Sequence, residues 1–222
     1  THGSPANRSG KYYNIASYSI DPETERINYD TVRALALKHK PKMIIAGNSS
    51  YPWIVDWLRF REIADEVGAY LLADISHVSG LVLAGEYPSP IGIADVVTTT
   101  THKALCGPRG ALILTHKRLL AGKLDKAVFP GEQGGPHVNV FAALATALKL
   151  ARTEQFIQGQ RREAAAQPDA GDDVWPVGNP HQQHCQQSDP AVTQFLAQAI
   201  HIDKGDHTHQ SCSELETQEG NP

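Results

Sequence analysis

The sequence of 222 residues lacks the features that mark several classes of protein. It has no run of about 18 apolar residues, so no transmembrane helix is expected. Residues 1–5 show no basic stretch before an apolar one, so no secretory signal is expected either. The three cysteines, Cys106, Cys185 and Cys212, lack metal-ligand spacing, which favours a reducing, cytoplasmic setting. The only methionine is Met43, so we expect the sequence to begin inside a longer protein.

Charge is distributed unevenly along the chain. In residues 1–163, 19 Lys and Arg stand against 15 Asp and Glu, whereas residues 164–222 have Lys204 against nine acidic residues. The first part has no basic stripe, so neither nucleic acid nor a membrane is expected as a partner. The second part is rich in Gln and His and poor in apolar pattern. We therefore predict a partial folded domain over 1–163 and an acidic tail over 164–222 that is disordered or results from a frameshift.

Apolar segments alternate with helical patterns in residues 1–163. Short apolar runs that suit buried strands occupy 42–47, 69–74, 94–101 and 110–115. Helical spacing is found over 30–40, with Asp30 as the N-cap, over 56–67, closed by Gly68, and over 138–152. The last of these is rich in Ala and Leu, which favours a core helix over an interaction stripe. Together the patterns predict an α/β fold with a mostly parallel sheet and helices on both faces.

Polar residues follow three of the predicted strands, where ligands bind in such folds. They are residues 48–51, 74–77 and 102–103. Lys103 follows a buried strand, so we expect partial desolvation to lower its pKa and to free its amine for a Schiff base. The alternative is an ordinary surface lysine. Asp74 suits a carboxylate that keeps a heterocyclic nitrogen protonated, or else a helix cap or a loop ion pair.

A lysine that forms a Schiff base and a carboxylate on a pyridine nitrogen are what pyridoxal 5′-phosphate (PLP) requires of a protein. A phosphate also needs donors. Thr100, Thr101 and the glycine-rich segment 131–135 offer hydroxyl and backbone N–H groups, although a single glycine-rich loop is weak evidence.

Several motifs, in one order along residues 1–163, resemble the serine hydroxymethyltransferase family. They are residues 96–103 (VVTTTTHK) with Leu105 and 107–110 (GPRG), residues 1–5 (THGSP), 40–42 (KPK), 74–81 (DISHVSGL) and 129–136 (FPGEQGGP). The resemblance implies the large domain of a fold-type-I PLP enzyme, here incomplete. The implied activity moves the hydroxymethyl carbon of serine to tetrahydrofolate and leaves glycine. It also implies a homodimer or homotetramer with shared sites.

The resemblance assigns roles to particular residues. It implies that Lys103 forms the Schiff base with PLP, that Asp74 pairs with the pyridine nitrogen and that His77 lies near the phenolic oxygen and the substrate. Thr100 would assist proton handling. The remaining matches are cofactor contacts: Ser49 in the loop after the first strand, His102 and Arg109 behind the lysine, and the backbone of Gly134 and Gly135 at the phosphate of a neighbouring subunit.

Other residues of the family's site have no match in this sequence. They include a histidine stacked on the cofactor ring and an arginine that binds the substrate carboxylate; no arginine follows Arg162. We therefore expect weak or no turnover from this chain alone. The alternative is a non-catalytic remnant that binds PLP or a full-length subunit.

A third interpretation is a metal-binding tail with His181, His184, Cys185, His207 and His209, but the spacing is a poor zinc pattern and no metal is predicted.

Overall fold

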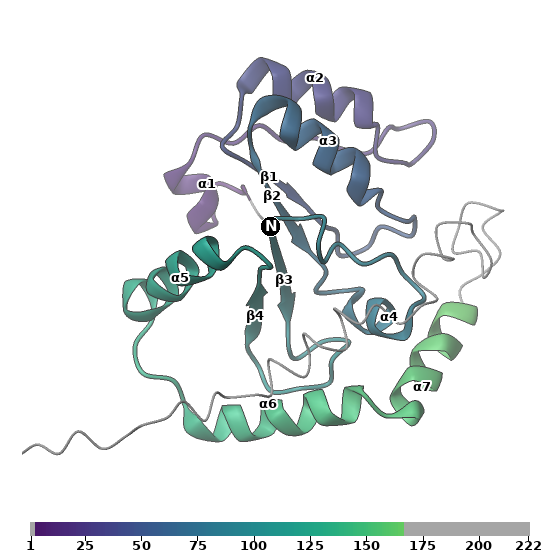
Figure 1. Ribbon diagram of the computed structural model, residues 1–222. Coiled ribbons are helices and arrows are strands. Elements are labelled where there is room, and N and C mark those ends of the chain that lie inside the picture. Colours follow the sequence, from purple (N-terminus) through teal and green to yellow (C-terminus); the bar gives the residue numbers. More distant parts are fainter. Residues whose placement is uncertain (1–2, 167–222) are drawn as a thin grey trace, which may run out of the picture.

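The structure, a computed structural model, describes residues 3–166 (Figure 1). Four strands form one sheet in the order β1-β2-β3-β4: β1 (Met43–Ala46), β2 (Tyr70–Asp74), β3 (Val96–Thr100) and β4 (Ala111–Leu114). The first three are parallel to one another, and β4 pairs antiparallel with β3. The predicted mostly parallel α/β sheet is confirmed. The predictions for the tail, including its metal ligands, lie outside the described residues from residue 167 onward.

The helices flank this sheet. They are α1 (Arg8–Tyr12), α2 (Tyr29–His39), α3 (Trp57–Val67), α4 (Ser79–Ala84), α5 (Arg118–Lys126) with the wide helical turn η1 (Ala127–Glu132), α6 (Val138–Ala151) and α7 (Glu154–Ala165). The N-cap predicted at Asp30 is wrong by two residues. The side chain of Asn28 accepts the N–H of Thr31, while Asp30 lies in the first turn. Gly68 ends α3 with left-handed backbone angles, as predicted. No helix in residues 3–166 is long and apolar enough to span a bilayer.

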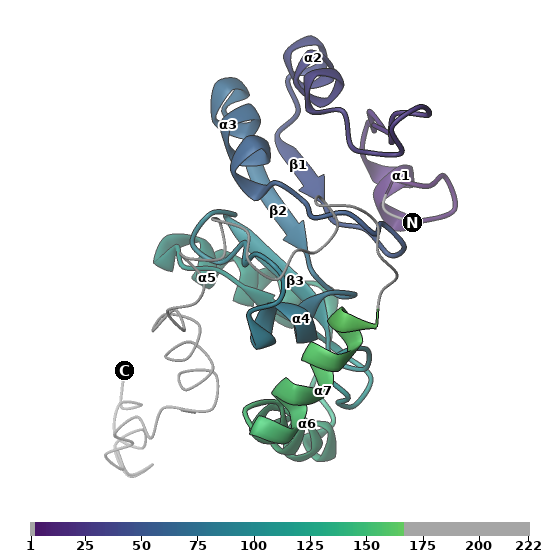
Figure 2. The same ribbon diagram turned by 90° about the vertical axis from the view of Figure 1, so that its right-hand side faces the viewer.

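The two faces of the sheet are covered to different degrees. One face presents side chains that are fully buried: Ile44, Ala46, Leu71, Ala73 and Thr99. The opposite face includes Met43, Tyr70 and Ile113, which are 44 to 49% exposed. In Figure 2, α3 and α5 lie to one side of the strands and α1 to the other. Parallel sheets are normally buried on both faces, so the second face is only partly covered by the described chain.

Helix α6 is not the core helix that its composition predicts. Only Ala147, Leu148 and Ala151 are buried, whereas Val138 is 78% exposed. The helix lies along the outside of the molecule, next to α7 (Figure 1). The error has a simple cause: apolar periodicity shows that a helix has an apolar face but not whether its own chain covers that face.

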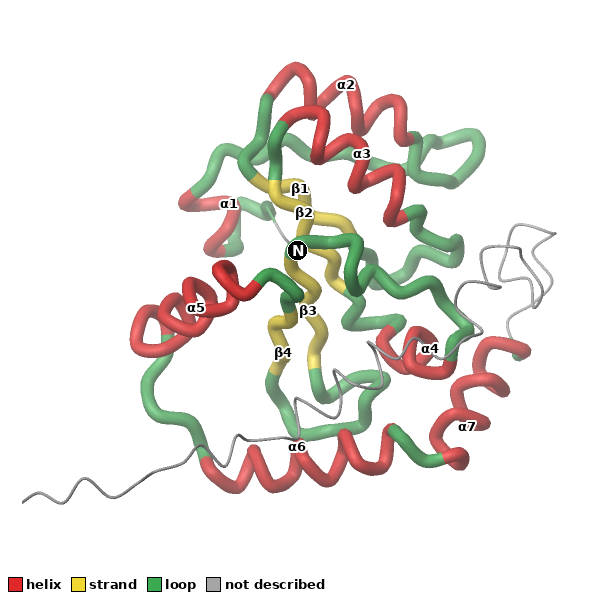
Figure 3. Tube along the Cα trace, in the orientation of Figure 1, coloured by secondary structure: helices red, strands yellow, loops and turns green. Residues whose placement is uncertain are grey.

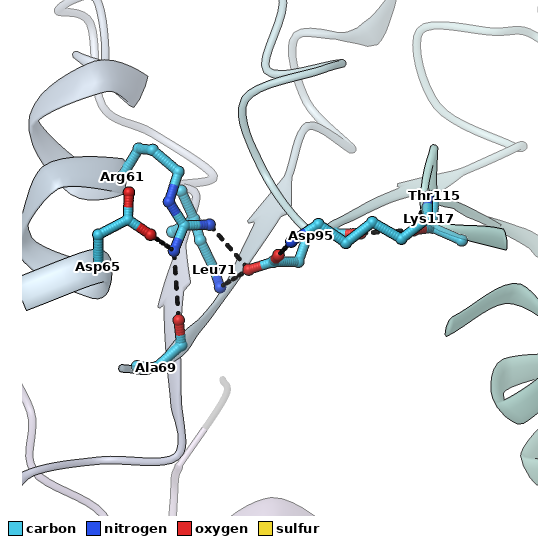
Figure 4. Close-up of polar contacts among 7 residues, drawn as sticks. All are labelled: Arg61, Asp65, Ala69, Leu71, Asp95, Thr115 and Lys117. Atoms are coloured by element: carbon cyan, nitrogen blue, oxygen red, sulfur yellow. Dashed lines mark hydrogen bonds and ion pairs between the residues drawn. The ribbon is translucent and has the colours of Figure 1, made fainter. Parts of the chain in front are cut away.

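A buried carboxylate joins three elements where β2 and β3 begin (Figure 4). Asp95, 3% exposed at its side chain, accepts hydrogen bonds from Arg61 of α3, from the N–H of Leu71 and from Lys117. Burial alone would raise the pKa of Asp95. The hydrogen bonds from Lys117, Leu71 and Arg61 outweigh it and lower the pKa to about 2. The carboxylate is therefore charged at neutral pH and holds α3, β2 and the start of α5 together.

Replacing this charge should destabilise the fold in a pH-dependent way. We expect Asp95→Asn to lower the free energy of unfolding at pH 7 by about 3 kcal/mol, because it leaves Arg61 without its buried partner. The stabilisation is fully present above the ordinary aspartate pKa of 3.8 and is lost as the pH falls through about 2. Urea unfolding of both proteins between pH 7 and pH 2 measures the difference. A gap that stays constant across this range would contradict the assigned role.

Candidate active site

Because β1, β2 and β3 are parallel, their carboxyl ends lie at one edge of the sheet. The strands are joined to the rest of the chain by loops, drawn green in Figure 3. The registers that bring this about pair Ala46 with Ala73 and Asp74 with Thr98. The loop 47–52, the turn 75–78 and the turn 101–105 therefore start from neighbouring points. The predicted site residues before Arg109 belong to these three segments or to the strand ends that precede them.

Lys103 and His77 meet at this edge. Lys103 Nζ lies 3.0 Å from His77 Nε2. A charged lysine can only donate, so the imidazole accepts through Nε2 and is neutral in this contact. Partial desolvation and the Lys103 charge lower the pKa of His77, and the nearby Asp74 opposes them. His77 therefore loses its proton at a lower pH than a free imidazole.

The predicted desolvation of Lys103 is wrong for the described chain. Both Lys103 and His77 are exposed. The lysine does not lie in the buried strand; it comes three residues after the end of β3, in a turn at the sheet edge. The sequence shows that the lysine follows an apolar strand, but it does not show whether other segments of the chain bury the side chain.

Asp74 and Ser76 link the ends of β2 and β3. Asp74 is half-buried, and its Oδ1 accepts the N–H of Ser76 at 2.9 Å. The hydroxyl of Ser76, a residue that is 5% exposed, accepts the N–H of Thr100 at 2.9 Å. Sequence spacing predicts no role for Ser76, because it does not show that the side chain reaches across to the next strand.

The two threonines at the end of β3 behave differently. Thr100 Oγ1 is buried and has no hydrogen-bond partner among the described residues. Thr101 is 1% exposed, and its hydroxyl donates to the carbonyl oxygen of Pro108 at 2.6 Å. The hydroxyl of Thr101 is thus occupied inside the fold, and its predicted availability for a phosphate is wrong. Alternation along the strand turns the two side chains to opposite faces.

The other predicted residues lie in loops and turns. Ser49 is exposed in the loop after β1, and Arg109 is exposed in the turn before β4. His102 Nδ1 accepts the N–H of Gly110 at 3.4 Å, which ties the lysine turn to the start of β4. Gly134 and Gly135 are exposed between η1 and α6, and a Cβ added to either would meet no atom within 4 Å. Their assigned partner is a neighbouring subunit, so these roles stay predictions.

The donor set at the sheet edge fits PLP. The exposed amine of Lys103 is accessible to an aldehyde, the imidazole of His77 lies beside it, and the carboxylate of Asp74 is near His77. The unpartnered Thr100 hydroxyl adds a polar atom on the same sheet face as Asp74. No cluster of metal-ligating side chains occurs among residues 3–166.

Comparison with known proteins places the chain in a family. Residues 1–167 match the family model described as serine hydroxymethyltransferase. The chain is 59% identical over 158 residues to the serine hydroxymethyltransferase of Synechococcus sp. (strain JA-3-3Ab), covering 71% of this chain and 36% of that protein. It is 58% identical over 156 residues to that of Cyanothece sp. (strain PCC 7425), covering 70% of this chain and 37% of that protein.

The fold and the comparison together define a part of a PLP-dependent transferase of fold type I. The chain belongs to the serine hydroxymethyltransferase family. It spans little more than a third of the length of these two relatives.

The contact between Lys103 and His77 can be tested through the imidazole. We expect Lys103→Ala to raise the pKa of His77, because it removes a positive charge that disfavours protonation. Lys103→Arg keeps the charge and should leave the pKa low. An NMR pH titration of the His77 ring in the ligand-free chain measures both. The same titration curve in wild type and in Lys103→Ala would contradict the contact.

Proposed function

We propose that the chain serves the PLP-dependent interconversion of serine and glycine, with transfer of the hydroxymethyl carbon to tetrahydrofolate. The observation that carries the proposal is the 3.0 Å contact of Lys103 with His77, next to Asp74, in a chain of this family. Bound PLP supplies an electron sink for charge that develops at the substrate Cα. The protein's part is to attach, orient and protonate the groups involved.

Four side chains would carry that part. Lys103 offers the amine that attaches the cofactor, and its exposure leaves it accessible. Asp74 offers a carboxylate that keeps the pyridine nitrogen protonated through a charge-assisted hydrogen bond. His77, neutral in its contact with Lys103, can take up or return a proton at Nε2. Thr100 offers a buried hydroxyl that has no partner among the described residues and would help to place a proton.

Outer contacts complete the proposed site. Ser49 and Arg109 lie in exposed loops and would contact a bound cofactor, and His102 supports the lysine turn through Gly110. The exposed backbone of Gly134 and Gly135 would serve the phosphate in a second subunit. A homodimer or homotetramer follows, and the exposed apolar side chains of Val138 and Phe141 on the neighbouring helix α6 support it. The exposed, free thiol of Cys106 supports a cytoplasmic setting.

A second function is favoured by the exposure of Lys103 and by the partial cover of the sheet. The chain would then bind PLP or a full-length subunit without turning over serine. Catalysis needs several oriented contacts at once, and a charge-assisted hydrogen bond that is missing costs about 1.5–3 kcal/mol, or tenfold or more in rate. Cofactor binding with very slow serine–glycine exchange would favour this function over the first.

The visible absorption spectrum after addition of PLP and desalting tests the proposal. We expect the wild-type chain to retain a visible band of lysine-bound cofactor, because the Lys103 amine is accessible next to Asp74 and His77. Lys103→Ala should lose the band. Lys38→Ala, a change at an exposed lysine of α2, should keep it.

Two outcomes would count against the proposal. If the folded wild-type chain retains no band, the cofactor site does not form. If Lys103→Ala retains as much band as Lys38→Ala, the cofactor is bound by surface lysines and the assigned attachment site is wrong.

A further inference from the structure

The backbone passes unusually close to Asp74 at the residue where β1 ends. Gly47 follows Ala46 directly, and its φ of +146° is a value that side-chain-bearing residues rarely adopt. A Cβ built on Gly47 would press against the carbonyl oxygen of Asp74. It would also lie 2.9 Å from Asp74 Cβ and 3.1 Å from its carbonyl carbon. Only a residue without a side chain allows this approach.

Neither Gly47 nor Asp74 can move to make room for a side chain without disturbing the backbone. The atoms that a methyl group would meet belong to the backbone and the Cβ of Asp74, not to the end of a flexible side chain. The ladder fixes Ala46 opposite Ala73, one residue before the close approach. On the far side, the N–H of Ile75 donates to the carbonyl of Thr98 at 2.9 Å. A side chain at residue 47 would therefore displace Asp74 or the loop that follows β1.

Gly47 differs in this respect from the other described glycines with positive φ. Gly68, Gly85 and Gly92 face open space, so only their backbone angles favour glycine. At Gly3, an added Cβ would meet the side chain of Ile15, which can move. Gly47 alone among them combines a positive φ with backbone contact, and the residue that it contacts carries the proposed site carboxylate.

We propose that Gly47 is a positioning residue for Asp74: its lack of a side chain lets the end of β1 pack against β2 and fixes where the carboxylate stands relative to His77 and Lys103. Any effect of Gly47 on catalysis rests on the proposed function. The positioning of Asp74 by Gly47 does not depend on the cofactor. The hydrogen bond from the Ser76 N–H to Asp74 Oδ1 reports on the orientation of the carboxylate.

The first test uses the ligand-free chain. Gly47→Ala is compared with Gly68→Ala, a second glycine with positive φ (69°, in the left-handed helical region). Gly68 has no atom within 4 Å of the added methyl and lies at the opposite end of β2. Hydrogen exchange by NMR follows the Ser76 amide. We expect Gly47→Ala to lose protection at Ser76 and Gly68→Ala to keep it, with both chains still folded by circular dichroism. Unchanged protection at Ser76 in Gly47→Ala would overturn the proposal.

A chain with Gly47→Ala that unfolds while Gly68→Ala folds would also overturn the proposal, because the proposed role is local to Asp74.

The second test measures PLP affinity by absorbance titration. We expect Gly47→Ala to weaken binding about tenfold or more, the effect of one misplaced charge-assisted hydrogen bond, and Gly68→Ala to leave it unchanged. If wild type binds no PLP, the proposed function fails, and the exchange of Ser76 still decides the role of Gly47.

Discussion

The pairing of β2 with β3 is the constraint on which the site depends. At each end of the pair, a side-chain oxygen accepts a hydrogen bond from a backbone N–H. At the start, the carboxylate of Asp95 accepts the N–H of Leu71. At the end, the hydroxyl of Ser76 accepts the N–H of Thr100. Backbone bonds hold the strands between these points, so the turns that carry His77 and Lys103 leave the sheet at fixed positions. A buried ion pair, Arg61 with Asp95, at the opposite end of these strands thus helps to set the geometry of the proposed chemistry.

The described chain presents a half-covered sheet face and an uncovered helix. Exposed Met43, Tyr70 and Ile113 lie on the sheet face that also carries Asp74, and α6 exposes Phe141 and Leu150. Parallel strands and Ala/Leu-rich helices normally bury such surfaces. The chain spans little more than a third of the relatives that it matches. Both observations agree with the exposure of Lys103 and His77 in the described residues.

Much of this fold could be predicted from the sequence, because its strands are short apolar runs bounded by glycine or polar residues. Gly68 and the apolar run over 42–47 are examples in which local chemistry decides the structure. The meeting of Asp74, His77 and Lys103 followed from one rule about the ends of parallel strands. The cover of Lys103 and of α6 could not be predicted, because burial depends on which distant segments pack there. The same reason hid the inward turn of Thr101 and the reach of Ser76 to the next strand. The approach of Gly47 to Asp74 depends on backbone angles that no spacing reveals.

The central claim is that Lys103, and no other lysine, is the residue that takes the cofactor. Borohydride reduction of the PLP-treated chain, followed by peptide mass mapping, tests it most directly. We expect one phosphopyridoxyl group per chain, on the peptide that contains Lys103. A label spread over exposed lysines such as Lys38 and Lys123, or the absence of any label in a folded sample, would contradict the claim.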